Sequence, residues 1–145
     1  MPATQCEAVV RRAVEEIWNA GQLDVADELF APDFVHHGGL ITDLVGGPEA
    51  VKFSVVLYRR AFPTLHITVD DVRAIGEMVT LHWTARGSPL AERANTDHAA
   101  ATGSLAGVTD SRLVGGKIAE SWTDWNRDLA LSRLLLASRE GGSPF

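Results

Sequence analysis

Apolar and polar positions follow a helical spacing in the first part of the chain. Over residues 6–20, apolar side chains recur every three or four positions and charged side chains fill the other side, which predicts an amphipathic helix. A shorter helix is expected from Asp24 to just before Pro32, because proline disfavours helical geometry in the residue that precedes it. A third helix opens with Pro48 in its first turn and runs to Phe62.

Strand patterns dominate the rest of the chain. Apolar and polar residues alternate over residues 65–69 and again over residues 79–86, with a hairpin at Gly76-Glu77 between them. A further strand is expected to reach Val114, and Lys117–Trp125 forms the last strand after a glycine turn.

Three less regular segments complete the pattern. The polar stretch from Gly87 to Gly103 predicts a long loop. Arg127–Ser138 is expected to form a short terminal helix, and residues 138–145 are expected to be a flexible tail. Helices followed by a meander of antiparallel strands predict an α+β fold.

Length and composition fit one globular domain over residues 1–145. The chain has 145 residues, of which 46% are hydrophobic and 22% charged, values that are ordinary for a compact protein with a single core. The net charge of −6 repels nucleic acid and anionic lipid, so we expect neither as a partner.

The cellular setting is expected to be the cytoplasm. The single cysteine, Cys6, cannot form an internal disulfide, which fits a reducing compartment. No apolar run approaches the roughly 20 residues of a membrane span, and the first residues lack the pattern of a signal peptide.

Motifs for common cofactors are missing from the sequence. It contains no GxGxxG, P-loop, GxSxG or HExxH pattern, so we expect no cofactor. His36 and His37 adjoin Asp33, but neighbours in a strand point to opposite faces, and we expect no metal there. His36 could face inward and relay a proton, or it could be a partly exposed loop residue.

The last strand carries an acidic residue between two tryptophans. A carboxylate at Asp124 that is surrounded by the indole rings of Trp122 and Trp125 would have its charged form desolvated, which raises its pKa toward a range useful for proton transfer. Asp124 is therefore a candidate general acid/base. Alternatively, Asp124 and Asn126 cap the terminal helix and both tryptophans belong to the core.

Several ordered segments resemble the SnoaL-like polyketide cyclases over roughly residues 8–136. No single segment is specific, but their combination is. The segments are Val9-Val10-Arg11-Arg12, Ala31-Pro32-Asp33-Phe34-Val35-His36, Gly47-Pro48-Glu49-Ala50-Val51, Ala61-Phe62-Pro63-Thr64-Leu65-His66, residues 79–87 (VTLHWTARG) and residues 115–122 (GGKIAESW).

The resemblance implies a nuclear-transport-factor-2-like cone, in which a curved antiparallel sheet wraps around three helices and encloses an apolar pocket. It also implies cofactor-free intramolecular aldol closure of an aromatic polyketide-type ketone. In such cyclases an aspartate on the last strand removes a proton beside a carbonyl and later reprotonates the product oxygen, a role that suits a carboxylate in a dry pocket.

This sequence departs from the family pattern at that aspartate. Counted without a gap, the family position falls on Thr123, and Asp124 reaches it only if a β-bulge inserts one residue. Asn126 follows an aromatic residue, and this pair resembles the pattern in the hydroxylation-associated relatives. His36 falls where relatives carry a polar pocket residue, and Thr109 falls where some cyclases carry a histidine.

We therefore expect a polyketide cyclase that acts on a small hydrophobic aromatic ligand, with Asp124 as acid/base and His36 polarising a substrate oxygen. The alternatives are a hydroxylation-associated or epoxide-opening relative, in which Thr123, Asp124 and Asn126 position oxygen or water, and a non-catalytic binding or dimerisation module. A homodimer through the outer face of the sheet is the family expectation. The expected ligand-binding residues are Trp122, Thr123, Trp125, Asn126, Phe53, Tyr58 and Thr109.

Overall fold

The computed structural model describes residues 2–38, 46–88 and 103–126. Its helices are α1 (Ala3–Arg12), the π-helix η1 (Ala13–Asn19), α2 (Val25–Leu29) and α3 (Gly47–Ala61). The first predicted helix is therefore α1 continued by the wider turns of η1. The predicted long loop falls almost entirely outside the described residues, and the predicted terminal helix and tail fall entirely outside them.

The strands form one five-stranded sheet in the order β1-β5-β4-β3-β2. Their bounds are β1 (Phe30–His37), β2 (His66–Ile75), β3 (Met78–Gly87), β4 (Gly103–Val114) and β5 (Lys117–Trp125). From β2 to β5 all neighbours are antiparallel, as predicted. At the other edge β1 pairs with β5 in parallel, a pairing that the antiparallel prediction for the strands after Leu65 did not cover.

The edge position of β1 explains how a strand can contain proline. The predicted second helix extends to residue 31, whereas α2 ends at Leu29 and Phe30 already has extended geometry. Pro32 lies within β1. An edge strand tolerates proline, which lacks a backbone N–H, because its outer side pairs with no further strand.

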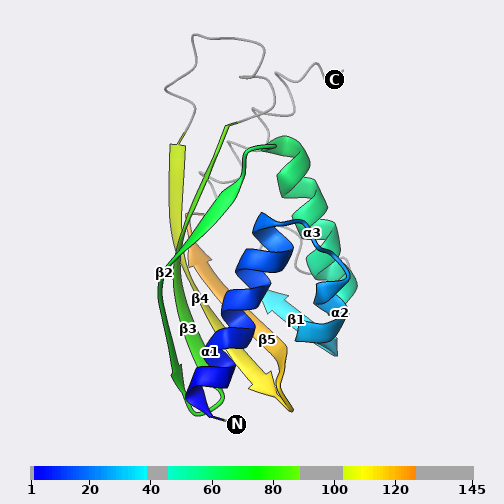
Figure 1. Ribbon diagram of the computed structural model, residues 1–145, viewed down its shortest axis with the longest axis vertical. Coiled ribbons are helices and arrows are strands. Elements are labelled where there is room, and N and C mark those ends of the chain that lie inside the picture. The colour runs from blue at the N-terminus through cyan, green and yellow to red at the C-terminus, as the bar shows by residue number, and fades with distance from the viewer. Residues whose placement is uncertain (1, 39–45, 89–102, 127–145) are drawn as a thin grey trace.

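The helices lie together on one side of the curved, open sheet (Figure 1). Alternation in β3 turns Val79, Leu81 and Trp83 toward this side, and all three are buried. They join Ile17 from η1 and Val55 from α3 in a single apolar core. The α+β prediction is confirmed, with the core between the helices and the sheet.

Polar contacts fix η1 between β2 and α3. The Asn19 side chain donates to the Ile67 carbonyl (2.8 Å) and accepts from the Ile67 amide (2.7 Å). Arg59 donates to the carbonyls of Trp18 (2.8 Å) and Asn19 (2.7 Å), which lie at the C-terminal end of η1. These bonds satisfy terminal carbonyls of the helix and fix the place of Trp18.

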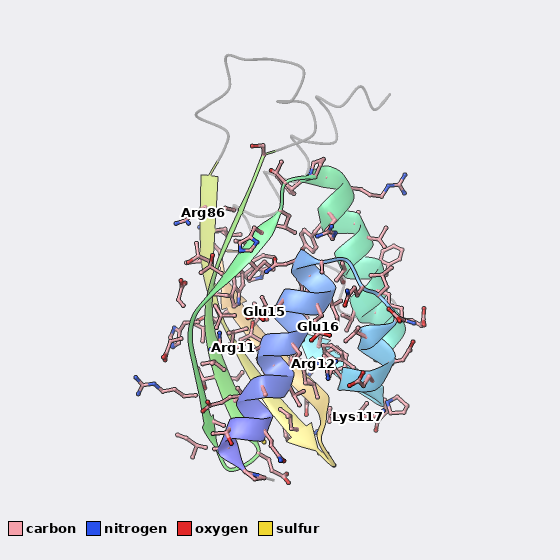
Figure 2. All side chains as sticks on the ribbon, in the orientation of Figure 1. Arg11, Arg12, Glu15, Glu16, Arg86 and Lys117 are labelled. Carbon is pink, nitrogen blue, oxygen red and sulfur yellow. The ribbon has the colours of Figure 1, made fainter. Side chains whose placement is uncertain are left out.

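Ion pairs connect the first helices on the solvent side. Figure 2 shows Arg12 and Glu16 next to each other, and Arg12 Nε lies 2.7 Å from Glu16 Oε2. Arg12 Nη1 also lies 2.6 Å from Glu28 Oε2 on α2. Exposed pairs of this kind contribute about 0–1 kcal/mol each, so the apolar core dominates the stability.

The helices in the described part of the chain do not combine the length and apolar character that a membrane crossing needs.

Candidate functional site

A cavity of about 210 Å³ lies between the helices and the inner face of the sheet. Most of its wall is apolar, and none of the described wall residues has a side chain that is charged at neutral pH. This volume is below the roughly 300 Å³ at which pockets for drug-sized ligands begin, so it suits a compact ligand. Polar side-chain atoms other than indole nitrogens come from His36, Ser54, Tyr58, Thr109, Ser111, Ser121 and Thr123.

A bulge decides which residues of β5 face this cavity. Leu113 pairs with Ile118, whereas the preceding residue of β4, Arg112, pairs with Glu120. Ala119 is therefore the extra residue. Because an extra residue reverses the alternation of a strand, Ile118 faces the cavity before the bulge and odd-numbered residues face it afterwards.

The bulge turns Asp124 away from the cavity. Thr123 and Trp125 line the wall, whereas Asp124 and Asn126 are exposed on the opposite face. Trp122 also lies on that outer face and is 38% exposed. The expectation that a bulge would carry Asp124 inward is wrong, because the bulge lies five residues earlier and acts in the opposite sense. Phe53, an expected pocket wall, is 52% exposed on α3.

His36 is the titratable imidazole in the cavity wall. It lies on β1 beside Ser121 of β5, and its ring stacks against Phe34 with 6.3 Å between ring centroids. Burial in these apolar surroundings lowers the pKa of His36 from 6.5 to about 4, and the neighbouring His37 contributes a smaller repulsion. The ring is therefore neutral near pH 7, when it can accept a proton at one nitrogen and donate from the other.

Two hydroxyl pairs cross from β4 to β5 on the cavity side. Ser111 Oγ lies 3.1 Å from Ser121 Oγ, and Thr109 Oγ1 lies 2.9 Å from Thr123 Oγ1. Each pair joins residues that are opposite in the strand register. Thr109 also accepts a hydrogen bond from Trp83 Nε1 (3.0 Å).

Four aromatic rings form a continuous series along the cavity wall. Trp18 contacts Tyr58 (5.8 Å between centroids), Tyr58 contacts Trp125 (6.4 Å), and Trp125 contacts Trp83 (5.7 Å). Trp125 Nε1 donates to the Gly38 carbonyl (2.8 Å), which fixes its indole plane. Such a wall favours a flat apolar ligand.

Gly107 allows the Trp83 ring to pack directly against the sheet. A Cβ at Gly107 would collide with the six-membered ring of this indole, so the ring lies directly on the β4 backbone. Absence of a side chain therefore allows close approach of an aromatic ring.

Four further wall residues were not predicted from the sequence: Trp18, Trp83, Ser111 and Ser121. Trp83 had a usable signal, because it belongs to the clear alternation in residues 79–86, and Trp18 lies on the apolar side of its helix. The serines carried no such signal, since their direction depends on the pairing of β4 with β5. Of the expected residues, the structure places His36, Tyr58, Thr109, Thr123 and Trp125 in the wall.

The outer face carries a separate charged cluster. His37 Nε2 lies 2.8 Å from Glu120 Oε2, and Arg112 donates to Glu120 Oε1 at 3.1 Å. These bonds from His37 and Arg112 lower the pKa of Glu120, while the His37 ring stacks on Trp122. His36 and His37 thus lie on opposite faces of the sheet, as strand geometry predicts.

Within the described ranges, no three His, Cys, Asp or Glu side chains gather as metal ligands. The chemistry that the wall itself offers is proton transfer through a neutral imidazole, hydrogen bonding through hydroxyl groups, and stacking on aromatic rings.

A protein-family model described as SnoaL-like polyketide cyclase matches residues 8–132. Among solved structures, a candidate polyketide cyclase from Bacillus cereus is 20% identical, with 92% of this chain and 82% of that chain covered and a TM-score of 0.75. A candidate SnoaL-like polyketide cyclase from a Jannaschia species is 24% identical, with coverage of 91% and 92% and a TM-score of 0.69.

AclR, a candidate hydroxylase from Streptomyces galilaeus, is 24% identical, with coverage of 92% and 82% and a TM-score of 0.67. At these identities the structural matches show a shared fold. No match was found among curated protein sequences.

Proposed function

The chain belongs to the SnoaL-like polyketide cyclase family, and from that premise we propose that it closes a ring in an aromatic polyketide-type ketone by a cofactor-independent intramolecular aldol reaction. The observation that carries this proposal is a neutral imidazole, His36, in an apolar and aromatic cavity.

His36 replaces Asp124 as the proposed acid/base. In the reaction, the carbon–hydrogen bond beside a carbonyl breaks and its proton passes to a ring nitrogen of His36. The resulting enolate carbon attacks a second carbonyl carbon of the same molecule, which forms the new carbon–carbon bond. The imidazolium then returns the proton to the alkoxide oxygen.

The lowered pKa of His36 supports this substrate class. An imidazole with a pKa of about 4 is a weak base, so it suits a carbon acid that is activated by an adjacent carbonyl and by conjugation. Its protonated form is correspondingly a stronger acid than an ordinary imidazolium, which favours return of the proton to the alkoxide. The apolar wall limits access of water to the enolate.

A second candidate function is ligand binding without catalysis. It is favoured by the outward position of Asp124, because no carboxylate is found among the described wall residues. The hydroxylation or epoxide-opening alternative needs Thr123, Asp124 and Asn126 to converge, but only Thr123 faces the cavity, so we do not propose it. Homodimer formation and cytoplasmic location remain predictions.

Proton exchange on a probe ketone tests the proposed chemistry. 2-Tetralone is a compact aromatic ketone with activated protons beside its carbonyl, and their exchange in D₂O can be followed by NMR. We expect the protein to accelerate this exchange above the buffer rate. His36→Gln should lower the acceleration by about 10²–10⁴-fold, the usual size of a general acid/base contribution.

His37→Gln is the matched control, since it makes the same substitution on the opposite face of the sheet. It should leave the exchange rate close to that of the unsubstituted protein. Binding of 2-tetralone without accelerated exchange would contradict the catalytic proposal and favour the binding function. Equal loss in both variants would remove His36 from its proposed role.

A further inference from the structure

A chain of hydrogen bonds connects Trp83 to the cavity surface. Trp83 Nε1 lies 3.0 Å from Thr109 Oγ1, which in turn lies 2.9 Å from Thr123 Oγ1. Trp83 is buried, and both threonines are partly buried in the cavity wall. The hydrogen-bonded series thus runs along the cavity wall, from the buried indole of Trp83 to the hydroxyl of Thr123.

The three hydrogen-bonded side chains have more donor hydrogens than there are hydrogen bonds between them. An indole N–H can only donate, and each threonine hydroxyl can donate one hydrogen. The three groups therefore hold three donor hydrogens, while two bonds join them. Among the described residues, no further acceptor is found for either hydroxyl, so one hydroxyl hydrogen is available to a ligand.

The Trp83 indole determines in which direction the hydrogen bonds of this series donate. Because Trp83 donates to Thr109, the head-to-tail arrangement has Thr109 donating to Thr123, whose own hydrogen then points away from the pair. Successive donors in one direction polarise one another and strengthen the last bond. The reverse direction would make Thr109 accept twice and would lose this effect.

We infer that Thr123 is a hydrogen-bond donor for a carbonyl or enolate oxygen of the ligand, and that Thr109 and Trp83 are positioning residues that orient its hydroxyl. This inference rests on the proposed aromatic-ketone ligand and names the group that binds its oxygen. A donor that is already oriented stabilises the negative charge that develops on the oxygen when the neighbouring proton leaves.

The lack of cationic side chains in the described cavity wall favours a neutral hydrogen-bond donor at Thr123. The described wall has no Lys or Arg side chain that could hold an oxyanion. His36 is the proposed base, which leaves the oxygen to be bound by another group. Thr123 lies two residues beyond Ser121, the register neighbour of His36, on the same face of β5. Base and donor can therefore contact neighbouring atoms of one ligand.

Two probes of the same shape separate oxygen binding from packing. 2-Tetralone carries a carbonyl oxygen, whereas tetralin is its hydrocarbon counterpart, and calorimetry gives the affinity of each. Thr123→Val keeps the side-chain shape but removes the donor. We expect it to weaken 2-tetralone binding by roughly 3- to 10-fold, the equivalent of one hydrogen bond, and to leave tetralin binding unchanged.

Further variants test the direction and the role of the hydroxyl. Thr123→Ser keeps the hydroxyl and should restore the affinity for 2-tetralone. Thr109→Val should weaken 2-tetralone binding less than Thr123→Val does, because it removes the orienting bond and leaves the donor. Thr80→Val is the matched control: Thr80 bonds to Asp110, outside the cavity wall, and its loss should change neither affinity.

A spectroscopic measurement examines the first bond. In Thr109→Val the indole N–H resonance of Trp83, assigned with Trp83→Phe, should move upfield because its acceptor is lost. In Thr123→Val that bond remains, so the resonance should stay near its original position.

Three results would overturn the inference: equal loss for ketone and hydrocarbon in Thr123→Val, no loss for either, or a larger loss in Thr109→Val than in Thr123→Val. Failure of the proposed catalysis is distinguishable, because it abolishes accelerated proton exchange while the ketone-specific effect of Thr123 on binding persists.

Discussion

Replacing His36 should alter how the stability of this protein depends on pH. The folded protein holds His36 with a pKa of about 4, against 6.5 for an ordinary histidine. Between these values the unfolded chain binds a proton at this residue and the folded protein does not. Protons therefore favour unfolding, and the stability that depends on neutral His36 is lost as the pH falls from about 6.5 to about 4.

The size of the effect follows from the shift in pKa. The difference of 6.5 minus about 4 is about 2.5 units, which at 1.36 kcal/mol per unit corresponds to about 3 kcal/mol. His36→Gln cannot take up this proton. Relative to the variant, the unsubstituted protein should therefore lose about 3 kcal/mol of unfolding free energy between pH 7 and pH 4.

Urea unfolding at a series of pH values measures this difference. Glu16, Glu28 and Glu120 have lowered pKa values, so both proteins also lose stability when these carboxylates are protonated. Comparison at each pH cancels that shared loss. His37→Gln, on the exposed outer face, should retain most of the pH dependence, because burial of His36 is the larger cause of its shift.

A difference between the two proteins that stays constant with pH would refute the burial argument. The rate of 2-tetralone exchange gives an independent check. It should rise with pH through about 4 and then level off, as a base with that pKa requires. A midpoint near the ordinary histidine value would show that the ring is hydrated and would contradict the proposed environment.

Two further substitutions test the geometry of the wall. Gly107→Ala should force the Trp83 ring away from β4, which should cost about 1–3 kcal/mol in urea unfolding and weaken 2-tetralone binding; unchanged stability and affinity would contradict the close contact. Asp124→Asn should leave the exchange rate unchanged and the unfolding free energy within about 0.5 kcal/mol, because the side chain is exposed outside the cavity; a large loss of exchange would contradict its outward position.

Local patterns in the sequence determined most of the elements. Strict alternation made Val79, Leu81 and Trp83 one buried face of a strand, and the structure confirms it. The turns at Gly76 and Gly115 lie between the predicted strands, and both glycines have a positive φ. Proline in the first turn of α3 likewise marks the start of that helix. These features depend on neighbours in the chain.

The tertiary structure decided which side chains share the cavity. The sequence allowed either Thr123 or Asp124 to face inward, since one extra residue anywhere earlier in β5 exchanges them. The pairing of β5 with β4 makes Ala119 the extra residue. Local alternation in the sequence does not show how a strand pairs with distant strands. The parallel pairing of β1 likewise brought His36 beside Ser121. The physical reason is that strand register is fixed by hydrogen bonds between segments far apart in the chain, whereas periodicity reports only the segment itself.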